Sequence, residues 1–191
     1  KLTNLISSHQ GGLFIGSHFG NLEYAYGLAS RHPKLVINVL VYNQHAQNFT
    51  SLIKDAGSDA VEILIQVTDI DFELALTLRE KVKRGEWVLI TGDRVPLGES
   101  SRVCSASFFG DKANFPIGPY VLANLLRCPV YLLHCFRVEN HYEVSVELFE
   151  EEFRTLRKTR QEAYERAAQK FANSLEKQVA RLPLQWFNFF D

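Results

Sequence analysis

The chain has 191 residues, enough for one domain with a substantial core, and its 46% hydrophobic and 23% charged residues exclude the disordered and fibrous classes. Its formal net charge is −1, from 21 Lys and Arg against 22 Asp and Glu, so the overall charge does not favour nucleic acid as a partner. The sequence is that of a globular protein whose function depends on local features.

The first half of the chain alternates predicted strands with predicted helices. A buried strand is predicted by the apolar run Gly12–Gly16, and apolar residues at helical spacing follow it. The same order repeats twice, so strands are predicted over residues 12–16, 35–42 and 61–67, and helices over residues 21–30, 45–56 and 71–83. We expect Asp69 or Asp71 to cap the third of these helices.

The second half begins with a strand over residues 86–91, which leads into Gly92-Asp93-Arg94-Val95-Pro96. A less regular extended stretch over residues 103–109, closed by Gly110-Asp111, is typical of a loop or edge element. The remaining predicted elements are an apolar helix over residues 119–126, a central strand over 130–138, an alternating strand over 142–149 and an amphipathic helix over 159–181. A turn at Asn140 joins the last two strands.

The order of these elements predicts the fold class. It indicates a single α/β domain over residues 1–191, with a mostly parallel central sheet, flanking helices and an antiparallel edge. Ligands of such sheets bind beyond the carboxyl ends of the strands. Because the chain begins at Lys1 without an initiator methionine, we expect a fragment of a longer protein. No apolar stretch reaches the roughly 20 residues of a membrane-spanning helix, although an anchor outside the fragment is compatible with the sequence.

The carboxyl end of the first predicted strand carries the residues best suited to catalysis. The loop that follows it, residues 16–23, reads Gly-Ser-His-Phe-Gly-Asn-Leu-Glu, with His18 in the loop and Glu23 in the first turn of the next helix. If Asn21 caps that helix, Glu23 can reach His18 and fix the imidazole tautomer that leaves the other ring nitrogen as a base. The alternative is that His18 is an ordinary loop residue and that Glu23 complements the helix dipole.

Two glycines favour the catalytic interpretation. Gly16 and Gly20 flank His18 and permit a sharp turn that a ligand can approach closely. The turn is similar to the Gly-x-Ser-x-Gly elbow of hydrolases, but a histidine occupies the position of the serine nucleophile. A base without a protein nucleophile implies that an external hydroxyl attacks. The alternative enzyme class is a thioesterase or esterase that uses Ser17 with His18.

Other polar and aromatic residues give weaker signals. The three cysteines are odd in number and form no Cys-x-x-Cys pair, which argues against a disulfide framework and favours a reducing compartment; they are Cys104, Cys128 and Cys135. The other five histidines lack metal-ligand spacing, so we expect no metal site. The basic segment 154–160 suits either anionic lipid or a solvated helix start. The aromatic residues at 186–190 suit either an acyl tunnel or a packed final segment.

These motifs together resemble a known family. Residues His18 to Glu23 are similar to the His-x4-Asp/Glu motif of the lysophospholipid acyltransferase superfamily, in the form found in lipid A biosynthesis acyltransferases. The middle segments Phe108-Phe109-Gly110, Phe115-Pro116-Ile117-Gly118 and Leu122-Ala123 and the closing Pro183-Leu184-Gln185-Trp186-Phe187 resemble further motifs of that family. Segments 92–96 and 185–191 are most similar to a bacterial branch described as predicted acyltransferases. Order and spacing agree over nearly the whole chain.

The resemblance implies a glycerol-phosphate acyltransferase-like fold and an O-acyltransferase. The donor would be an acyl carrier protein or coenzyme A thioester, and the acceptor a hydroxyl of a lipid or glycolipid. His18 would be the catalytic base and Glu23 its orienting partner, with no redox or metal cofactor and no nucleic-acid partner. The protein would attach peripherally to the cytoplasmic face of the bacterial inner membrane. A lipid-binding module that retains the fold without catalysis is the non-enzymatic alternative.

The resemblance also implies four substrate-binding residues. Asn21 matches the motif, and Gly20 lies beside it. For the proposed mechanism itself, backbone amides near Gly20 and Asn21 or at the Arg94 turn are the candidates for binding an oxyanion. Asp93 and Arg94 occupy the turn where related acyltransferases use Gly-x-Arg for an acceptor phosphate, whereas the lipid A branch favours Asp-Gln there. A guanidinium suits bidentate phosphate binding, but a salt bridge of Arg94 with Asp93 or Glu99 is the alternative.

Overall fold

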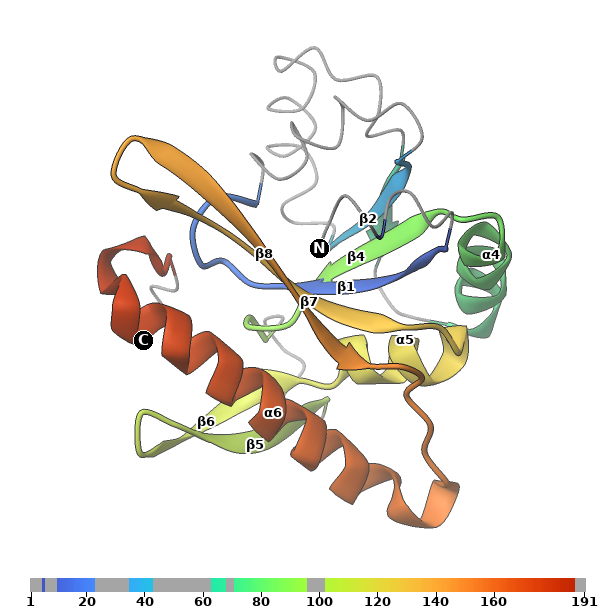
Figure 1. The fold of residues 1–191 in the computed structure, drawn as a ribbon. Helices are drawn as coiled ribbons and strands as arrows, with labels where there is room; N and C mark the ends of the chain where they lie inside the picture. Colours follow the sequence, from blue (N-terminus) through green and yellow to red (C-terminus); the bar gives the residue numbers. More distant parts are fainter. Residues whose placement is uncertain are drawn as a thin grey trace.

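The structure is a computed structural model that describes residues 5, 10–22, 35–42, 63–67, 71–95 and 102–187 (Figure 1). Its strands are β1 (Gly12–Gly16), β2 (Ile37–Tyr42), β3 (Ile63–Val67), β4 (Trp87–Thr91), β5 (Val103–Phe108), β6 (Asp111–Pro116), β7 (Val130–Val138) and β8 (His141–Glu150). Its helices are α4 (Phe72–Lys83), α5 (Gly118–Leu126) and α6 (Arg160–Arg181), with the short 3-10 helices η1 (Arg157–Thr159) and η2 (Pro183–Gln185).

Six strands form one sheet in the order β3-β2-β4-β1-β7-β8. The first five run parallel to one another, and β8 pairs antiparallel with β7 at one edge. β5 and β6 form a separate antiparallel hairpin. The predicted α/β fold, with a mostly parallel sheet and an antiparallel edge, is therefore confirmed.

β1 lies in the interior of the large sheet, between β4 and β7. All five of its residues are buried, as expected for a parallel strand covered on both faces. Phe14 stacks on Trp87 of β4 with ring centroids 4.3 Å apart, whereas Leu13 and Ile15 belong to the core cluster of the opposite face. The loop that follows β1 therefore starts from a strand held by packing on both sides.

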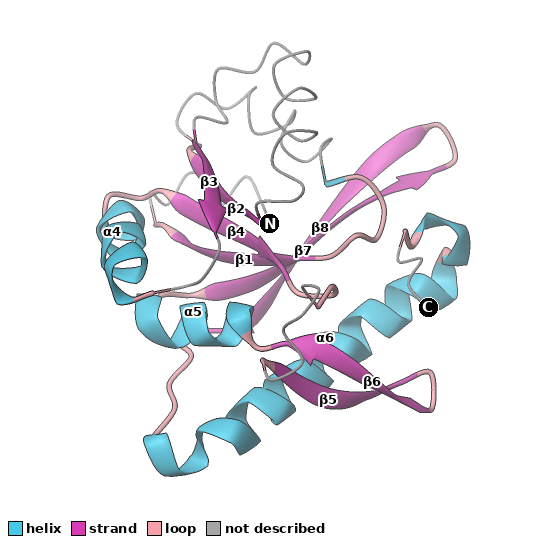
Figure 2. Cartoon of the chain, turned by 180° about the vertical axis from the view of Figure 1, so that it is seen from behind, coloured by secondary structure: helices cyan, strands magenta, loops and turns pink. Residues whose placement is uncertain are grey.

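One face of the large sheet is covered by α4, α5, α6 and the β5–β6 hairpin (Figure 2). Apolar side chains from all of these elements share a core cluster with β1, β4 and β7. α6 buries the apolar positions at helical spacing that predicted it, namely Tyr164, Ala168, Phe171, Leu175 and Val179. The amphipathic pattern therefore correctly indicated both the helix and its buried face.

The helix predictions in the first half of the chain are tested only in part. Asp71, one of the two predicted caps, accepts a hydrogen bond from the main-chain N–H of Leu74 at 2.8 Å and begins α4. Of the helix predicted over residues 21–30, only residues 21 and 22 are described. The helix predicted over residues 45–56 lies outside the described residues.

The β5–β6 hairpin differs from the sequence prediction. The prediction had one irregular extended stretch and no strand over residues 111–116, whereas β6 pairs in regular register with β5 from Val103–Pro116 to Phe108–Asp111. The β6 sequence Asp-Lys-Ala-Asn-Phe-Pro contains few residues that favour strands, so the strand cannot be recognised from its local sequence. Tertiary packing compensates, since Phe115 contacts the ring of Phe171 on α6 with centroids 5.9 Å apart.

Candidate active site

His18 and Asp93 meet at the carboxyl end of the large sheet. β1 and β4 are parallel neighbours, with Gly16 opposite Thr91, and the main-chain N–H of Gly92 donates to the Gly16 carbonyl at 2.9 Å. Because both strands end at the same level, the loops that follow them start side by side. This edge of an α/β sheet is where ligands bind.

The Asp93 carboxylate forms two hydrogen bonds with His18. Its Oδ1 lies 2.8 Å from Nδ1 of the imidazole, and its Oδ2 accepts the main-chain N–H of His18 at 2.8 Å. The Asp93 side chain is fully buried, whereas 31% of the His18 side chain is exposed. A buried carboxylate that holds both the ring and the backbone of one residue fixes the position and the orientation of that ring.

The contact with Asp93 favours one tautomer of a neutral His18 imidazole. An ionised carboxylate only accepts hydrogen bonds, so Nδ1 of His18 carries the hydrogen and Nε2 keeps its lone pair. Because Nδ1 faces the buried Asp93, the exposed part of the ring carries Nε2. The arrangement is that of a general base oriented by a carboxylate.

The orienting contact is made by a residue other than the one predicted for it. Glu23 lies outside the described residues, so its predicted contact with His18 stays a prediction. Asp93 was predicted to bind substrate, but both of its carboxylate oxygens bond to His18. Within the described ranges, Asp93 is the carboxylate that orients the imidazole.

Gly20 and Asn21 hold the His18 loop against β7. Gly20 has a φ of 75°, and a Cβ there would lie 1.9 Å from the carbonyl oxygen of Cys135, so only glycine fits. The N–H of Gly20 donates to the Gln185 carbonyl at 2.6 Å, and that of Asn21 to the Cys135 carbonyl at 2.7 Å. Both N–H groups are therefore bonded within the protein and are not available to an oxyanion. That another amide near them or at the Arg94 turn binds an oxyanion stays a prediction. A substrate contact of the Asn21 side chain stays a prediction.

The closing segment, residues 185–187, lies antiparallel to the His18 loop. Trp186 pairs with Phe19 as an isolated β-bridge, and the N–H of Phe187 donates to the His18 carbonyl at 3.0 Å. Two chain segments more than 160 residues apart in sequence thus form the wall of the site. The His18 loop is held by main-chain hydrogen bonds on both sides.

The side chain of Gln185 connects this closing segment to β7. Its Oε1 accepts the main-chain N–H of Arg137 at 2.8 Å, and its Nε2 donates to the carbonyl of the same residue at 2.7 Å. Its own carbonyl accepts the Gly20 N–H. Gln185 therefore connects the His18 loop to β7: one hydrogen bond holds Gly20 of the loop, and two hold Arg137 of β7.

Arg94 lies beside the same segment. Its Nη2 donates to the carbonyl of Phe187, whose N–H bonds to His18. The guanidinium is therefore close to the His18 loop, on the side of the closing segment. Its predicted role as an anion ligand stays a prediction, and Glu99, one of its two predicted alternative partners, lies outside the described residues.

Ser17 contacts a histidine other than His18. Its Oγ lies 3.5 Å from Nδ1 of His134 on β7, and both side chains are buried. Burial lowers the pKa of His134 to about 4, so its ring is neutral at neutral pH. A serine that solvent does not reach, in contact with a different imidazole, does not support the Ser17–His18 pair of the alternative hydrolase.

The remaining candidates for chemistry behave as core residues. All three cysteines are free and buried, and burial raises the pKa of the Cys104 and Cys128 thiols to about 12.

Among the side chains that the structure describes, no group of three or more His, Cys, Asp or Glu is placed to hold a metal ion. No helix in the described part of the chain is long and apolar enough to cross a membrane.

Comparison of the sequence with models of protein families shows to which family the chain is related. The sequence model of the bacterial lipid A biosynthesis acyltransferase family matches residues 2–190. The chain belongs to this acyltransferase family. A search of curated proteins finds no match. The match confirms the resemblance of the motifs and shows an acyltransferase in general, with an acyl donor and a lipid acceptor.

Sequence reasoning found both members of this acyltransferase's central pair but not their contact. His18 and Asp93 each lie two residues after the end of a predicted strand, which is the available signal. What the sequence lacks is the strand order, because β4 is adjacent to β1 although two other strands separate them along the chain. Gln185 was identified as part of a motif, and its partner Arg137 carries no motif of its own.

Proposed function

We propose that this acyltransferase moves a fatty acyl group from the thioester of an acyl carrier protein or of coenzyme A to a hydroxyl of a lipid or glycolipid. The observation that carries the proposal is the pair of His18 and Asp93, in which a buried carboxylate holds Nδ1 and the rest of the ring is partly exposed. A hydroxyl is a weak nucleophile until a positioned base removes its proton. We infer that His18 is that base.

The proposed reaction has one bond-forming and one bond-breaking step. Nε2 of His18 takes the proton of the acceptor hydroxyl as that oxygen attacks the thioester carbonyl carbon. The tetrahedral intermediate then expels the thiolate, which breaks the carbon–sulfur bond, and the protonated His18 returns the proton to the leaving sulfur. Asp93 stabilises the imidazolium that exists between these steps. Glu23 is the second candidate for this stabilising role.

The proposal has no acyl-enzyme intermediate. Ser17, the serine nearest to His18 in sequence, is buried and contacts His134. Donor and acceptor must then occupy the site together, and the acceptor oxygen attacks the donor directly. A thioesterase or esterase that works through Ser17 would instead carry the acyl group on the protein.

The two mechanisms differ in what happens without an acceptor. The purified protein and its Ser17→Ala variant are incubated with palmitoyl-coenzyme A alone, and the intact protein mass is measured. We expect an unchanged mass for both proteins, and sequential kinetics once an acceptor is added. A stable acyl adduct that disappears in Ser17→Ala, together with ping-pong kinetics, would establish the hydrolase-type mechanism. Tight lipid binding without turnover of any donor would indicate the non-catalytic module.

Arg94 is proposed to bind an anionic group of the acceptor, since its guanidinium lies beside the closing segment next to His18. Replacing Arg94 with lysine keeps the charge but removes the planar fork that binds phosphate at two points. We expect the KM for a phosphorylated glycolipid acceptor to rise roughly tenfold, with the KM for the thioester donor nearly unchanged. A variant with a lower melting temperature and an unchanged acceptor KM would show that Arg94 has a structural role only.

The proposal includes peripheral attachment to the cytoplasmic face of the bacterial inner membrane. Thioester donors are made in the cytoplasm, and a lipid acceptor is confined to a membrane, so the reaction requires a protein that reaches both. The buried free cysteines are compatible with a reducing compartment.

A further inference from the structure

The turn of the β5–β6 hairpin holds a phenylalanine in an unfavourable conformation. Phe108 pairs with Asp111, so the turn consists of Phe109 and Gly110 alone. Their φ values are 52° and 89°, and positive values at both positions define a type I′ turn. Asn, Asp or Gly is favoured at the first position, because a bulky side chain in the left-handed region is strained. The residue at Phe109 is therefore poorly suited to the turn itself.

Burial of the Phe109 side chain does not explain this strained conformation. Its side chain is 49% exposed, although its edge contacts Phe108 with ring centroids 4.8 Å apart. The turn is nevertheless held in place, since the N–H of Phe109 donates to Oε1 of Glu176 on α6 at 3.0 Å. Gln169 fixes the same hairpin through two hydrogen bonds to the main chain of Ser107. The fold thus presents an exposed aromatic ring on a fixed support.

Two ring contacts and one main-chain bridge connect Phe109 to the His18 loop. Phe108 contacts Trp186 with ring centroids 5.1 Å apart, and Trp186 pairs with Phe19, the residue after His18. Two further exposed apolar residues lie near Trp186 in sequence: Leu184 of η2 is 93% exposed and Phe187 of the closing segment is 47% exposed. We call Phe109, Leu184 and Phe187 the apolar rim.

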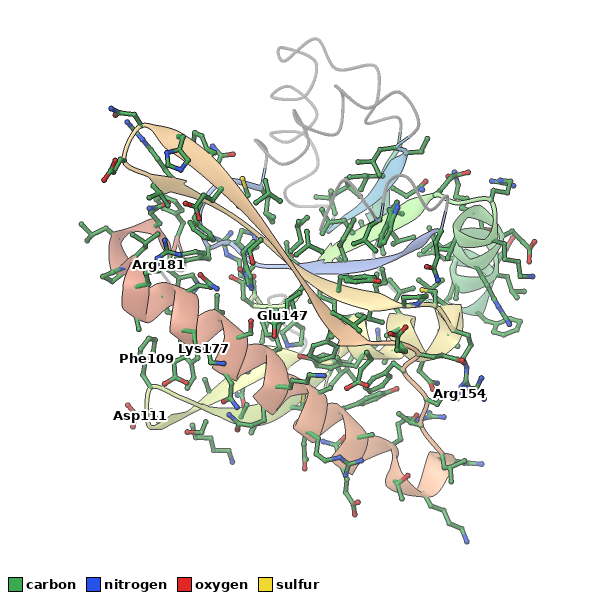
Figure 3. All side chains as sticks on the ribbon, viewed as in Figure 1. Phe109, Asp111, Glu147, Arg154, Lys177 and Arg181 are labelled. Carbon is green, nitrogen blue, oxygen red and sulfur yellow. The ribbon has the colours of Figure 1, made fainter. Side chains whose placement is uncertain are left out.

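Cationic side chains accompany the apolar rim. Figure 3 shows Phe109 at the tip of the hairpin, beside the C-terminal half of α6, which carries Lys177 and Arg181. Both cations are exposed, as is Lys112 on β6. Acidic groups of the same region include Asp111 on the hairpin, Glu176, which is bonded to the Phe109 N–H, and Glu147 of β8, which accepts a hydrogen bond from Ser174 one turn before Lys177. An exposed apolar surface with Lys and Arg around it is complementary to an anionic lipid surface.

We propose that the apolar rim docks the protein onto an anionic phospholipid bilayer, with Phe109 and Leu184 inserted among the lipid chains and the cations at the headgroups. The proposal rests on the proposed function, in which the acceptor is a lipid. Because Phe187 is bonded to the His18 loop, a bilayer at the rim lies at the entrance to His18, and the acceptor reaches the base without leaving the membrane. This accounts for a strained phenylalanine at a position where asparagine would fit the turn better.

The test uses a substitution that suits the turn. Phe109→Asn removes the apolar side chain and places a residue that favours the left-handed region, so the melting temperature is expected to stay unchanged or rise. Binding is measured by co-sedimentation with vesicles of phosphatidylcholine alone and of phosphatidylcholine with about 30% phosphatidylglycerol. We expect wild type to bind the anionic vesicles more tightly than the neutral ones, and Phe109→Asn to weaken this binding roughly fivefold. Leu184→Ser should weaken it similarly.

Leu156→Asn is the matched control. Leu156 is 75% exposed and lies within the basic segment 154–160, before the first turn of α6, whereas Phe109 of the rim bonds to Glu176 in the C-terminal half of that helix. The rise from Arg160 to Glu176 is about 24 Å. We expect this variant to bind vesicles like wild type. Equal binding by wild type and Phe109→Asn, or an equal loss in Leu156→Asn, would overturn the proposal. A concentration-dependent dimer that Phe109→Asn abolishes, without vesicle binding, would assign the rim to a second copy. None of these measurements requires turnover, so they are independent of the proposed reaction.

Discussion

Replacing His18 with alanine is expected to lower kcat by about 10² to 10⁴-fold while the protein stays folded, because a positioned general base contributes that much to a rate. The side chain is only partly buried, and its bond to Asp93 is the one hydrogen bond of the ring that the described residues show. The variant should therefore keep its melting temperature within a few degrees of wild type. The loss should appear in kcat and in kcat/KM alike, since the base acts in the transition state.

His141→Ala is the matched control for His18→Ala. His141 lies at the start of β8, is exposed, and its ring contacts Glu143 at 3.4 Å, not His18 or Asp93. We expect the His141→Ala substitution to leave the rate of acyl transfer unchanged. A folded His18→Ala protein that keeps half of its rate would remove His18 from the mechanism.

Replacing Asp93 with asparagine is expected to cause the second-largest loss, about 10²-fold or more in kcat, because it disturbs the tautomer of the base. The Asp93 carboxylate accepts two hydrogen bonds from His18, one from Nδ1 and one from the main-chain N–H. An asparagine has one accepting oxygen, so it keeps one of these bonds and directs an NH₂ group at the other donor. It also removes the charge that stabilises the imidazolium.

The comparison of Asp93→Asn with Glu23→Gln separates the two candidates for the orienting carboxylate. If Asp93 orients the imidazole, Asp93→Asn should also change the pH profile of kcat/KM, and Glu23→Gln should have the smaller effect. A structural role of Asp93 alone would lower the melting temperature and leave the shape of the pH profile unchanged. An unchanged rate in Asp93→Asn with a large loss in Glu23→Gln would return the orienting role to Glu23.

The predictions of the fold were accurate where local pattern and tertiary packing agree. β1, β7 and α6 each have an apolar pattern that matches the surface they bury, so their positions were predicted within a few residues. β6 was missed because its residues have little strand preference and depend on packing of Phe115 against α6. The spacing of apolar residues predicts an element when it matches the surface that the element buries. It does not predict a strand such as β6, whose structure depends on packing against another element.

The candidate site was predicted from motifs, and its contacts were not. His18 stands out because glycines flank it at the end of an apolar strand, a local feature. Its contact with Asp93 spans 75 positions in sequence and depends on β1 lying beside β4. The use of the Gly20 and Asn21 amides within the protein likewise depends on Gln185 and Cys135, which distant segments supply. A single sequence therefore shows candidate residues of such a site but not which of them contact one another.

The central claim is that His18 drives acyl transfer to a lipid hydroxyl, and lipid mass spectrometry tests it most directly. Lipids are extracted from bacterial cells that carry either the wild-type gene or the His18→Ala variant at equal protein level, and the two extracts are compared. The account predicts lipids that gain one ester-linked acyl chain with wild type and are absent with His18→Ala. Identical lipids in the two extracts, with both proteins folded, or acylated lipids that persist in His18→Ala would contradict it.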